Sequence, residues 1–381
     1  MIKIVFFCGS LQVGRDGVGD YCRRLAVELV RTGHSVGIVA LNDQHINEAF
    51  GGFQDSGGMK LPVLRLPSHW SLTQRMKAIR PWVDDFDPAW LSLQFVPFAF
   101  HPKGLPIGMG NLLSSLGTGR RWHIMVHELW VGMDKQSPLK FVCWGWLQKQ
   151  LIRSLFTKLS PAVIHTQTDL YVQMLKRLAF KAKLLPLFGN IPVTGAPCVT
   201  NKYGSTCNDE SISFVVFGGI HPGAPITSLA QELKMYGLKN GKKIVLKMIG
   251  RCGPEQARWE QEWKAADLSL ELFGEQSAER ISEVLSNSSF GISTTPALLV
   301  EKSGSVAAMR EHGRQVLCVS RQWEPRGISH LQPSFGVTQY QEGSIQKFIL
   351  GNHSSGPVND IAGVAIQFVN NLLSTEKHGK F

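Results

Sequence analysis

A chain of 381 residues with 43% hydrophobic content can build a large core, and its length suggests two domains or one large one. No stretch reaches the ~18 uninterrupted apolar residues of a transmembrane helix, and the apolar run after Lys3 is too short for a signal peptide, so we expect a cytoplasmic protein. The net charge of +11 favours an anionic partner (a phosphate, a nucleic acid or a membrane surface), and seven cysteines without zinc-ligand spacing predict buried free thiols.

Apolar runs typical of strands alternate with helical patterns in the first half of the chain. A strand over 3–10 leads through a glycine-bearing loop into a helix over 20–34, in which Gly33 marks the end, and a second strand follows at 35–43. Continuous apolar runs joined by helices indicate a buried parallel sheet. Later strands of the same sheet are expected at 89–97, 121–129 and 161–168.

A change of composition divides the chain. Residues 189–211 are rich in Gly, Pro, Asn, Ser and Thr, as linkers are, and after them strands and helices alternate again, with a helix at 277–287. We therefore predict an α/β protein of two doubly wound Rossmann-like domains, 1–198 and 205–356, with a helix in 357–381 packing back on the first. Ligands of such domains bind in strand-to-helix loops. The strands of the second half are expected at 212–223, 242–253, 268–276, 288–296 and 315–323.

Two basic segments, 147–159 and 171–188, mix Lys and Arg with Leu and Phe at helical spacing. They are predicted to be amphipathic helices with a solvated basic face, and docking on an anionic membrane surface is the alternative.

The loop after the first strand carries Gly17 and Gly19, which would let a ligand approach the backbone at a helix N-terminus. It lacks the GxGxxG dinucleotide fingerprint, because Cys22 stands where the third glycine would be. Asp43, at the end of the second strand, keeps a ribose-binding role open, and a simple glycine turn is the other interpretation.

Three further loops hold candidate residues. His127 ends a strand beside Glu128, although a lone histidine is more often structural. Gly218 and Gly219 end another strand, with His221 in the loop that follows, where a phosphate could meet the backbone or a turn could simply form.

The stretch 301–305 precedes a helix-like segment. The N–H groups and hydroxyls of Lys302, Ser303, Gly304 and Ser305 could surround a diphosphate at the positive end of the helix dipole, or a serine could serve only as N-cap. The acid Glu301 would repel phosphates, so we expect it to face the hydroxyls of an attached sugar.

Together these stretches resemble the retaining GT-B glycosyltransferases, in particular the family four enzymes that use nucleotide sugars. The resemblance covers nearly the whole chain and is carried by "GRDGVGDYCRRLAVELVRTGHSV", "VHELW", "LPLFGNIPV" and "LFGEQSAERISEVLSNSSFGISTTPALLVEKSGSVAAMREHG". It implies transfer of a sugar to an acceptor hydroxyl with retention, in glycan or polysaccharide biosynthesis.

The same resemblance implies roles for individual residues. Glu301 and His127 would face the donor sugar as the catalytic pair, and Phe273 would lie near the base. It implies no metal and no cofactor besides the nucleoside-diphosphate sugar, and an acceptor held by the N-terminal domain. From composition, the basic helices within 147–188 would fit a glycan or lipid-linked acceptor at a lipid surface, so the cytoplasmic protein expected above could also be peripheral on the inner face of the membrane. The remaining donor-binding residues are Gly17, Val18, Gly218, Gly219, His221, Lys302, Ser303, Gly304 and Ser305.

Two features depart from the family pattern. Met309 stands where a second Glu, which binds ribose, is usual, and the Arg and Lys that clamp the diphosphate are missing after the strand that ends at Gly218. Arg251, His221 or Lys302 is the candidate substitute. A binding protein without catalysis, a sugar-nucleotide epimerase of the same fold and a nicotinamide-dependent oxidoreductase stay open as alternatives, and nucleic-acid binding is the weakest.

Overall fold

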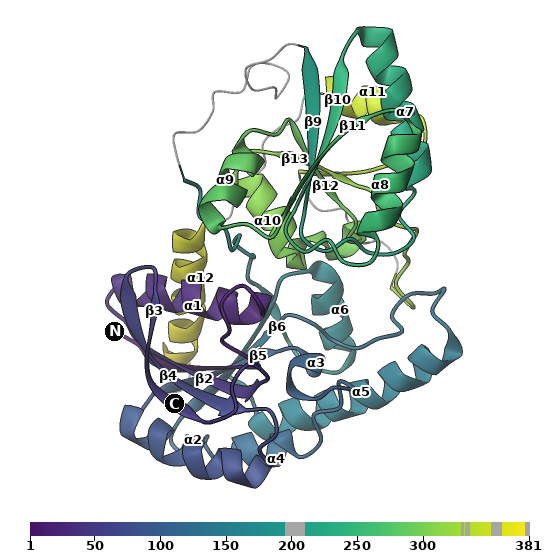
Figure 1. Cartoon of the computed structure of the whole chain (residues 1–381). Helices are drawn as coiled ribbons and strands as arrows, with labels where there is room; N and C mark the ends of the chain where they lie inside the picture. The colour runs from purple at the N-terminus through teal and green to yellow at the C-terminus, as the bar shows by residue number, and fades with distance from the viewer. Residues whose placement is uncertain (195–209, 329–330, 332–335, 352–359, 378–381) are drawn as a thin grey trace. The chain divides into compact units, whose positions relative to one another are not determined.

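The computed structural model describes residues 1–194, 210–328, 331, 336–351 and 360–377 (Figure 1). The chain forms two compact units, one of Met1–Pro186, Glu324–Ser329 and Asp360–Phe381, the other of Leu187–Trp323 and His330–Asn359. The N-terminal segment of the first unit thus stops at Pro186, before the predicted boundary at 198, and the segment Glu324–Ser329, which also belongs to this unit, was not part of the prediction. There, Arg326 donates to the carbonyls of Asp134 and Lys135, and Arg177 donates to that of Gly327.

The first unit is built on an eight-stranded sheet of order β3-β4-β2-β1-β5-β6-β7-β8. Every neighbouring pair is parallel except β3 with β4, and the central strands are buried on both faces, as predicted from their continuous apolar runs. The strands are β1 (Lys3–Cys8), β2 (Ser35–Asp43), β3 (Phe50–Ser56), β4 (Met59–Pro67), β5 (Trp90–Phe95), β6 (Arg121–Val126), β7 (Val163–Thr166) and β8 (Lys183–Leu184).

Apart from α12, the helices of this unit lie between consecutive strands of its sheet. They are α1 (Gly17–Arg31), α2 (Leu72–Phe86), α3 (Pro97–Phe100), α4 (Met109–Ser114), α5 (Leu139–Leu159), α6 (Asp169–Arg177) and α12 (Ile361–Lys377). At one edge of the sheet, β3 and β4 are joined by a tight hairpin turn rather than by a helix. Gly57 and Gly58, both at positive φ, form this turn between Ser56 and Met59.

Helix α12 belongs to the first unit although it ends the chain. Its Phe368 is buried against Phe6, at 6.0 Å between ring centroids, and against His123, at 5.0 Å. At the β8 edge of the sheet, the Gln367 side chain donates to the Leu184 carbonyl. The predicted segment 357–381 therefore contains a helix that packs on β1 and β6 and covers part of an open edge.

The second unit is a six-stranded, wholly parallel sheet of order β11-β10-β9-β12-β13-β14. Its strands are β9 (Ser211–Phe217), β10 (Lys243–Ile249), β11 (Ser269–Gly274), β12 (Phe290–Ser293), β13 (Gln315–Cys318) and β14 (Val337–Gln339). Its helices are α7 (Ile226–Asn240), α8 (Gln256–Ala265), α9 (Ala278–Ser286), the 3-10 helix η1 (Ala297–Lys302), α10 (Gly304–Glu311) and α11 (Ile345–Leu350). Apolar clusters cover both faces of this sheet, one around Trp259 and Trp263, the other around Met309.

The predicted basic helix over 171–188 is wrong in extent. Helix α6 ends at Arg177, and the chain turns at Ala179, which has a φ of 66°. Phe180 leaves the helical path to pack edge-to-face on Phe156, 5.5 Å away, and the next residues form β8.

The predicted burial of the thiols holds for Cys8, Cys22, Cys252 and Cys318, whereas Cys143 is exposed on α5. The other two cysteines, Cys198 and Cys207, and most of the predicted linker lie outside the described residues.

Candidate functional site

In the second unit, the predicted donor-binding residues follow the carboxyl ends of adjacent strands. Phe273 ends β11, Arg251 follows β10, Gly218 follows β9, and η1 follows β12. Hydrogen bonds join these strand ends, from Gly250 N to the Gly274 carbonyl (2.7 Å) and from Gly218 N to the Ile249 carbonyl (2.9 Å). The residues therefore share one edge of the sheet, which is the edge where parallel α/β sheets bind ligands.

Gly218 and Ser305 bring the loop after β9 against the start of α10. Gly218 has a φ of 77°, and a Cβ added to it would lie 3.0 Å from the Ser305 hydroxyl oxygen. A side chain at this position would be strained in its backbone and crowded by Ser305. Next in the loop, His221 donates its N–H to the Thr294 hydroxyl (2.7 Å), and its Nδ1 lies 3.1 Å from the same oxygen, which ties the loop to the end of β12.

The N-terminus of α10 has the N-cap that the sequence allowed. The Ser303 hydroxyl accepts a hydrogen bond from Val306 N at 3.4 Å. Ser303 thus has a structural role that needs no ligand. Gly304 and Ser305 present their N–H groups at the same helix end, where the helix dipole favours an anion.

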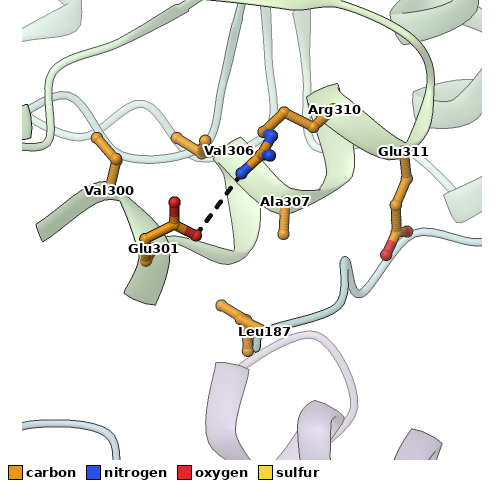
Figure 2. A pocket seen from close by; sticks show the side chains of 7 residues that line it. All are labelled: Leu187, Val300, Glu301, Val306, Ala307, Arg310 and Glu311. Atoms are coloured by element: carbon orange, nitrogen blue, oxygen red, sulfur yellow. Dashed lines mark ion pairs between the residues drawn. The ribbon is translucent and has the colours of Figure 1, made fainter. Parts of the chain in front are cut away.

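Glu301 lies in η1 and forms an ion pair with Arg310 of α10, with 3.6 Å between Oε2 and Nη1 (Figure 2). The two side chains line a hollow of about 10 Å³, room for about one water molecule. Nearby, Glu311 accepts a hydrogen bond from Gly189 N at 2.6 Å. Arg310 therefore engages one oxygen of the Glu301 carboxylate, and a sugar hydroxyl that approached this oxygen would compete with Arg310 for it.

Two of the predicted donor-binding residues, Arg251 and Phe273, are exposed or partly exposed at this sheet edge. The Arg251 Nε lies 3.3 Å from a carboxylate oxygen of Glu275, and both side chains are about half exposed. The guanidinium of Arg280 stacks over the Phe273 ring, 5.4 Å from its centroid. Arg251 is therefore a cation at the same sheet edge as Gly218, and Phe273 offers an aromatic face there that is already covered in part.

In the first unit, His127 follows β6 and is buried. Its Nε2 lies 3.0 Å from Gln94 Oε1, and its Nδ1 lies 2.9 Å from Gln167 Nε2. The Tyr21 ring packs edge-on against it, with 5.0 Å between centroids. Since an amide oxygen only accepts and an amide nitrogen only donates, these partners specify a neutral imidazole with the proton on Nε2.

The hydrogen bonds continue from Gln94 through the sheet. Gln94 Nε2 donates to the Ser92 hydroxyl (2.8 Å), which lies 2.7 Å from His123 Nδ1, and His123 Nε2 lies 3.0 Å from His165 Nδ1. On α12, Asn371 Nδ2 donates to His165 Nε2 at 3.0 Å. This series from Asn371 to His127 is called the histidine chain below.

Burial keeps His123 and His165 of the histidine chain neutral. It lowers the pKa of His165 to about 3, with the nearby charge of Lys183 acting in the same direction. The pKa of His123 is also held well below its usual value, first by burial and then by the neighbouring His165. When His123 and His165 are neutral, each ring has one N–H to donate and one lone pair to accept. This matches the two hydrogen bonds that each ring makes in the histidine chain.

The donors predicted around Gly17 and Val18 have a partner within the protein. Asp16 is the N-cap of α1, and its Oδ1 accepts from Val18 N (2.9 Å) and from Gly19 N (3.0 Å). Gly19 is required for packing, because an added Cβ would lie 2.3 Å from the Ser10 carbonyl oxygen, whereas one on Gly17 would meet nothing within 4 Å. The anion at this helix end is thus a carboxylate of the chain itself.

Asp43 does not fit the ribose-binding role left open above. It is fully buried, accepts from Arg65 Nε at 2.8 Å, and also accepts from Ser10 Oγ and Leu11 N. Burial alone would raise the pKa of Asp43, but the hydrogen bonds from Arg65, His45 and Leu11 hold it below its usual value. The carboxylate therefore anchors the loop after β1 rather than facing a ligand.

The sequence analysis did not identify Gln94, Gln167 or Arg310. A signal was present for Gln94, because a glutamine inside the apolar run "WLSLQF" must find a partner when the strand is buried. Arg310 carried no such signal, since a basic residue in the last turn of a helix is common. Among the described residues, no group of three or more His, Cys, Asp or Glu side chains could hold a metal ion.

Comparison with solved structures identifies the fold. The chain is similar to HepE of Anabaena in complex with UDP and glucose, with 13% identity, a TM-score of 0.60, and coverage of 98% of this chain and 100% of that one. It is also similar to the catalytic domain of starch synthase IV from Arabidopsis thaliana bound to ADP and acarbose, with 12% identity, a TM-score of 0.59 and 99% of each chain covered.

An epimerase belongs to the same set of similar structures. A putative UDP-N-acetylglucosamine 2-epimerase from Listeria monocytogenes shares 10% identity, with a TM-score of 0.56 over 100% of this chain and 98% of that one. No protein-family profile and no curated protein matches the sequence. At these identities the likeness establishes the fold alone: two Rossmann-like domains of the GT-B type, as predicted.

Proposed function

We propose that the protein is a glycosyltransferase that moves a sugar from a nucleoside diphosphate to the hydroxyl of a glycan or of a lipid-linked acceptor. The observation that carries the proposal is the shared sheet edge of the second unit, where Gly218, Arg251 and the start of α10 follow adjacent strands. Complexes of two similar structures with UDP and with ADP support a nucleoside diphosphate as the ligand of this edge.

In the proposed reaction, the bond between the anomeric carbon and the diphosphate oxygen breaks, and the acceptor oxygen bonds to that carbon. The N–H groups of Gly304 and Ser305, with Lys302 and the dipole of α10, stabilise the charge that develops on the leaving diphosphate. The acceptor proton passes to the diphosphate, and retention of configuration is part of the proposal. Glu301 binds hydroxyls of the donor sugar, in competition with Arg310.

A second candidate is a sugar-nucleotide-binding protein that lacks transferase activity. Two observations favour it: Glu301 is paired with Arg310, and both ring nitrogens of His127 are engaged by glutamine side chains. A sugar-nucleotide epimerase is the third, supported by the similarity to such enzymes. An oxidoreductase is disfavoured, because the acid that would bind ribose, Asp43, is buried and held by Arg65.

The test is calorimetric binding of UDP, GDP, ADP and NAD to the full chain, followed by the matching nucleotide sugars with wild type and Glu301→Ala. We expect one nucleoside diphosphate to bind, and Glu301→Ala to weaken the sugar conjugate by about tenfold while leaving the free diphosphate unchanged, the loss of about one charged hydrogen bond. Asp84→Ala, which removes a half-exposed carboxylate in the first unit, is the control.

The outcomes separate the three candidates. Transfer to an added acceptor supports the transferase, and interconversion of the sugar without an acceptor supports the epimerase. Binding of a diphosphate with neither reaction supports the non-catalytic relative. Binding of NAD alone would overturn the proposal.

A further inference from the structure

Helix α5 has an exposed face that is apolar over its first turns. Four side chains on this face are exposed: Leu139 (79%), Cys143, Trp146 (62%) and Leu147. They are called the α5 apolar face below. It shares only Leu147 with the predicted segment 147–159, of which Ile152, Leu155, Phe156 and Leu159 are buried in the core.

Two glycines explain why α5 turns this face outward. A Cβ on Gly145 would lie 2.0 Å from the Val131 carbonyl oxygen, and one on Gly132 would lie 2.4 Å from that of Phe141. The helix is therefore pressed against the loop after β6 through backbone, and Gln148 fixes the contact by accepting from Val131 N and donating to the Gly104 carbonyl. Leu139, Cys143 and Trp146 lie on the opposite side of the helix.

The charged side chains of α5 itself are all basic. Residues 135–168 contain five basic side chains and no Asp or Glu. Lys140 and Lys149 flank the α5 apolar face, with their ammonium groups over the rings of Phe141 (5.0 Å) and Trp130 (5.2 Å), and Arg153 is exposed one turn further on. Lys135 is set apart, because it pairs with Glu324 at 2.7 Å.

We propose that the α5 apolar face docks the protein on an anionic lipid surface, with Trp146 and Leu139 inserted at the headgroup level and Lys140, Lys149 and Arg153 facing lipid phosphates. Aromatic and aliphatic side chains flanked by Lys and Arg, without acids, are the chemistry that anionic bilayer interfaces bind. Among the described residues, no helix is both long and apolar enough to cross a bilayer, so the contact proposed is peripheral. The inference does not depend on the proposed reaction.

The experiment is co-sedimentation of the full chain with vesicles of phosphatidylcholine alone and with about 30% phosphatidylglycerol, without nucleotide. We expect binding only to the anionic vesicles, with a loss on raising the salt concentration. The double variant Leu139→Ser/Trp146→Ser should bind at least about tenfold more weakly, and Lys140→Gln/Lys149→Gln should lose about fivefold per lysine.

The matched control is Met235→Ser/Leu238→Ser, which removes two equally exposed apolar side chains of α7, a helix that also carries Glu232. It should bind vesicles as wild type does. Unchanged binding by the Leu139→Ser/Trp146→Ser variant, or equal binding to neutral and anionic vesicles, would overturn the proposal. So would a wild-type dimer that this variant converts to a monomer, because the face would then be a contact between copies of the chain.

Nucleotide binding by the vesicle-deficient variant is measured in parallel. Retained binding shows that the variant is folded, so a loss of vesicle binding then reports on the face itself. A failure of every nucleotide to bind wild type would overturn the proposed function and leave the docking result intact.

Discussion

Arg310 and Glu301 are nine positions apart in sequence, and their charged groups lie 3.6 Å apart in an ion pair that joins η1 to α10. The pair is partly exposed, so its own contribution to stability is about 0–1 kcal/mol. Its consequence is for binding, because the guanidinium competes with any sugar hydroxyl for the lone pairs of Glu301.

Replacing Arg310 by Gln should therefore strengthen the sugar-dependent part of binding. We expect the affinity for the free nucleoside diphosphate to stay within about twofold and that for the nucleotide sugar to rise by about two- to fivefold, the equivalent of a weak ion pair. Calorimetry with both ligands measures the ratio. A loss of more than tenfold in diphosphate affinity would instead make Arg310 a phosphate ligand.

Gln94 controls the orientation of His127. Gln94→Leu removes the acceptor of the Nε2 proton, so we expect the ring to change tautomer or rotate, with a loss of about 1–3 kcal/mol in the free energy of unfolding. Nitrogen-15 NMR of the histidine rings reports the tautomer. The control is Gln148→Leu, which removes another fully buried glutamine but should leave the His127 signals unchanged.

The neutral histidines make the stability of the first unit depend on pH. In the unfolded chain His123 and His165 take up protons below about pH 6.5, while burial keeps them neutral in the folded protein, so the unfolded state binds more protons. Their contribution is fully present above about pH 6.5 and is lost as the pH falls toward the folded pKa values. The expected slope is about 1.4 kcal/mol per pH unit for each histidine.

Urea unfolding followed between about pH 7 and pH 5 measures this slope. The variant His165→Gln removes one of the two protons, so its stability should fall less steeply with acidification than that of wild type. An identical slope would show that His165 is protonated in the folded protein.

The two glycines at the start of α1 offer a matched pair. Gly19→Ala places a Cβ 2.3 Å from a backbone oxygen and should cost about 1–3 kcal/mol, whereas Gly17→Ala meets nothing and should change stability by less than about 0.5 kcal/mol. Thermal unfolding distinguishes them. If Gly17→Ala nevertheless weakens nucleotide binding, the predicted approach of a ligand to Gly17 gains direct support.

The fold could be predicted because the sequence patterns of its strands and helices are local and recur along the chain. Buried parallel strands such as β1, β2 and β10 are continuous apolar runs, and α9, predicted as a helix at 277–287, begins after an N-cap serine, Ser277. The antiparallel β3–β4 hairpin was missed, since its strand β3 is largely exposed and carries no apolar run. The length of α6 was missed because a contact of Phe180 with the distant Phe156 overrides helical spacing.

The candidate site was predictable in part for the same reason. Gly218, Arg251 and the stretch 301–305 each follow a predicted strand, so the order of the elements in the chain is enough to predict that they share one edge of the sheet. Residue spacing does not predict which side chains pair in the folded protein. Three such pairings were missed: Asp16 as the N-cap of α1, Arg65 on the buried Asp43, and Gln94 and Gln167 on His127.

The position of α12 has a consequence for synthesis. Phe368 and Asn371 complete the interior of the first unit, although α12 follows every strand of the second unit in the chain and is made after them. During synthesis the N-terminal sheet therefore has its histidines and its β8 edge uncovered until α12 has left the ribosome. Chains that stop short of residue 361 should keep a complete second sheet and an unfinished first one, open at its edge to other chains.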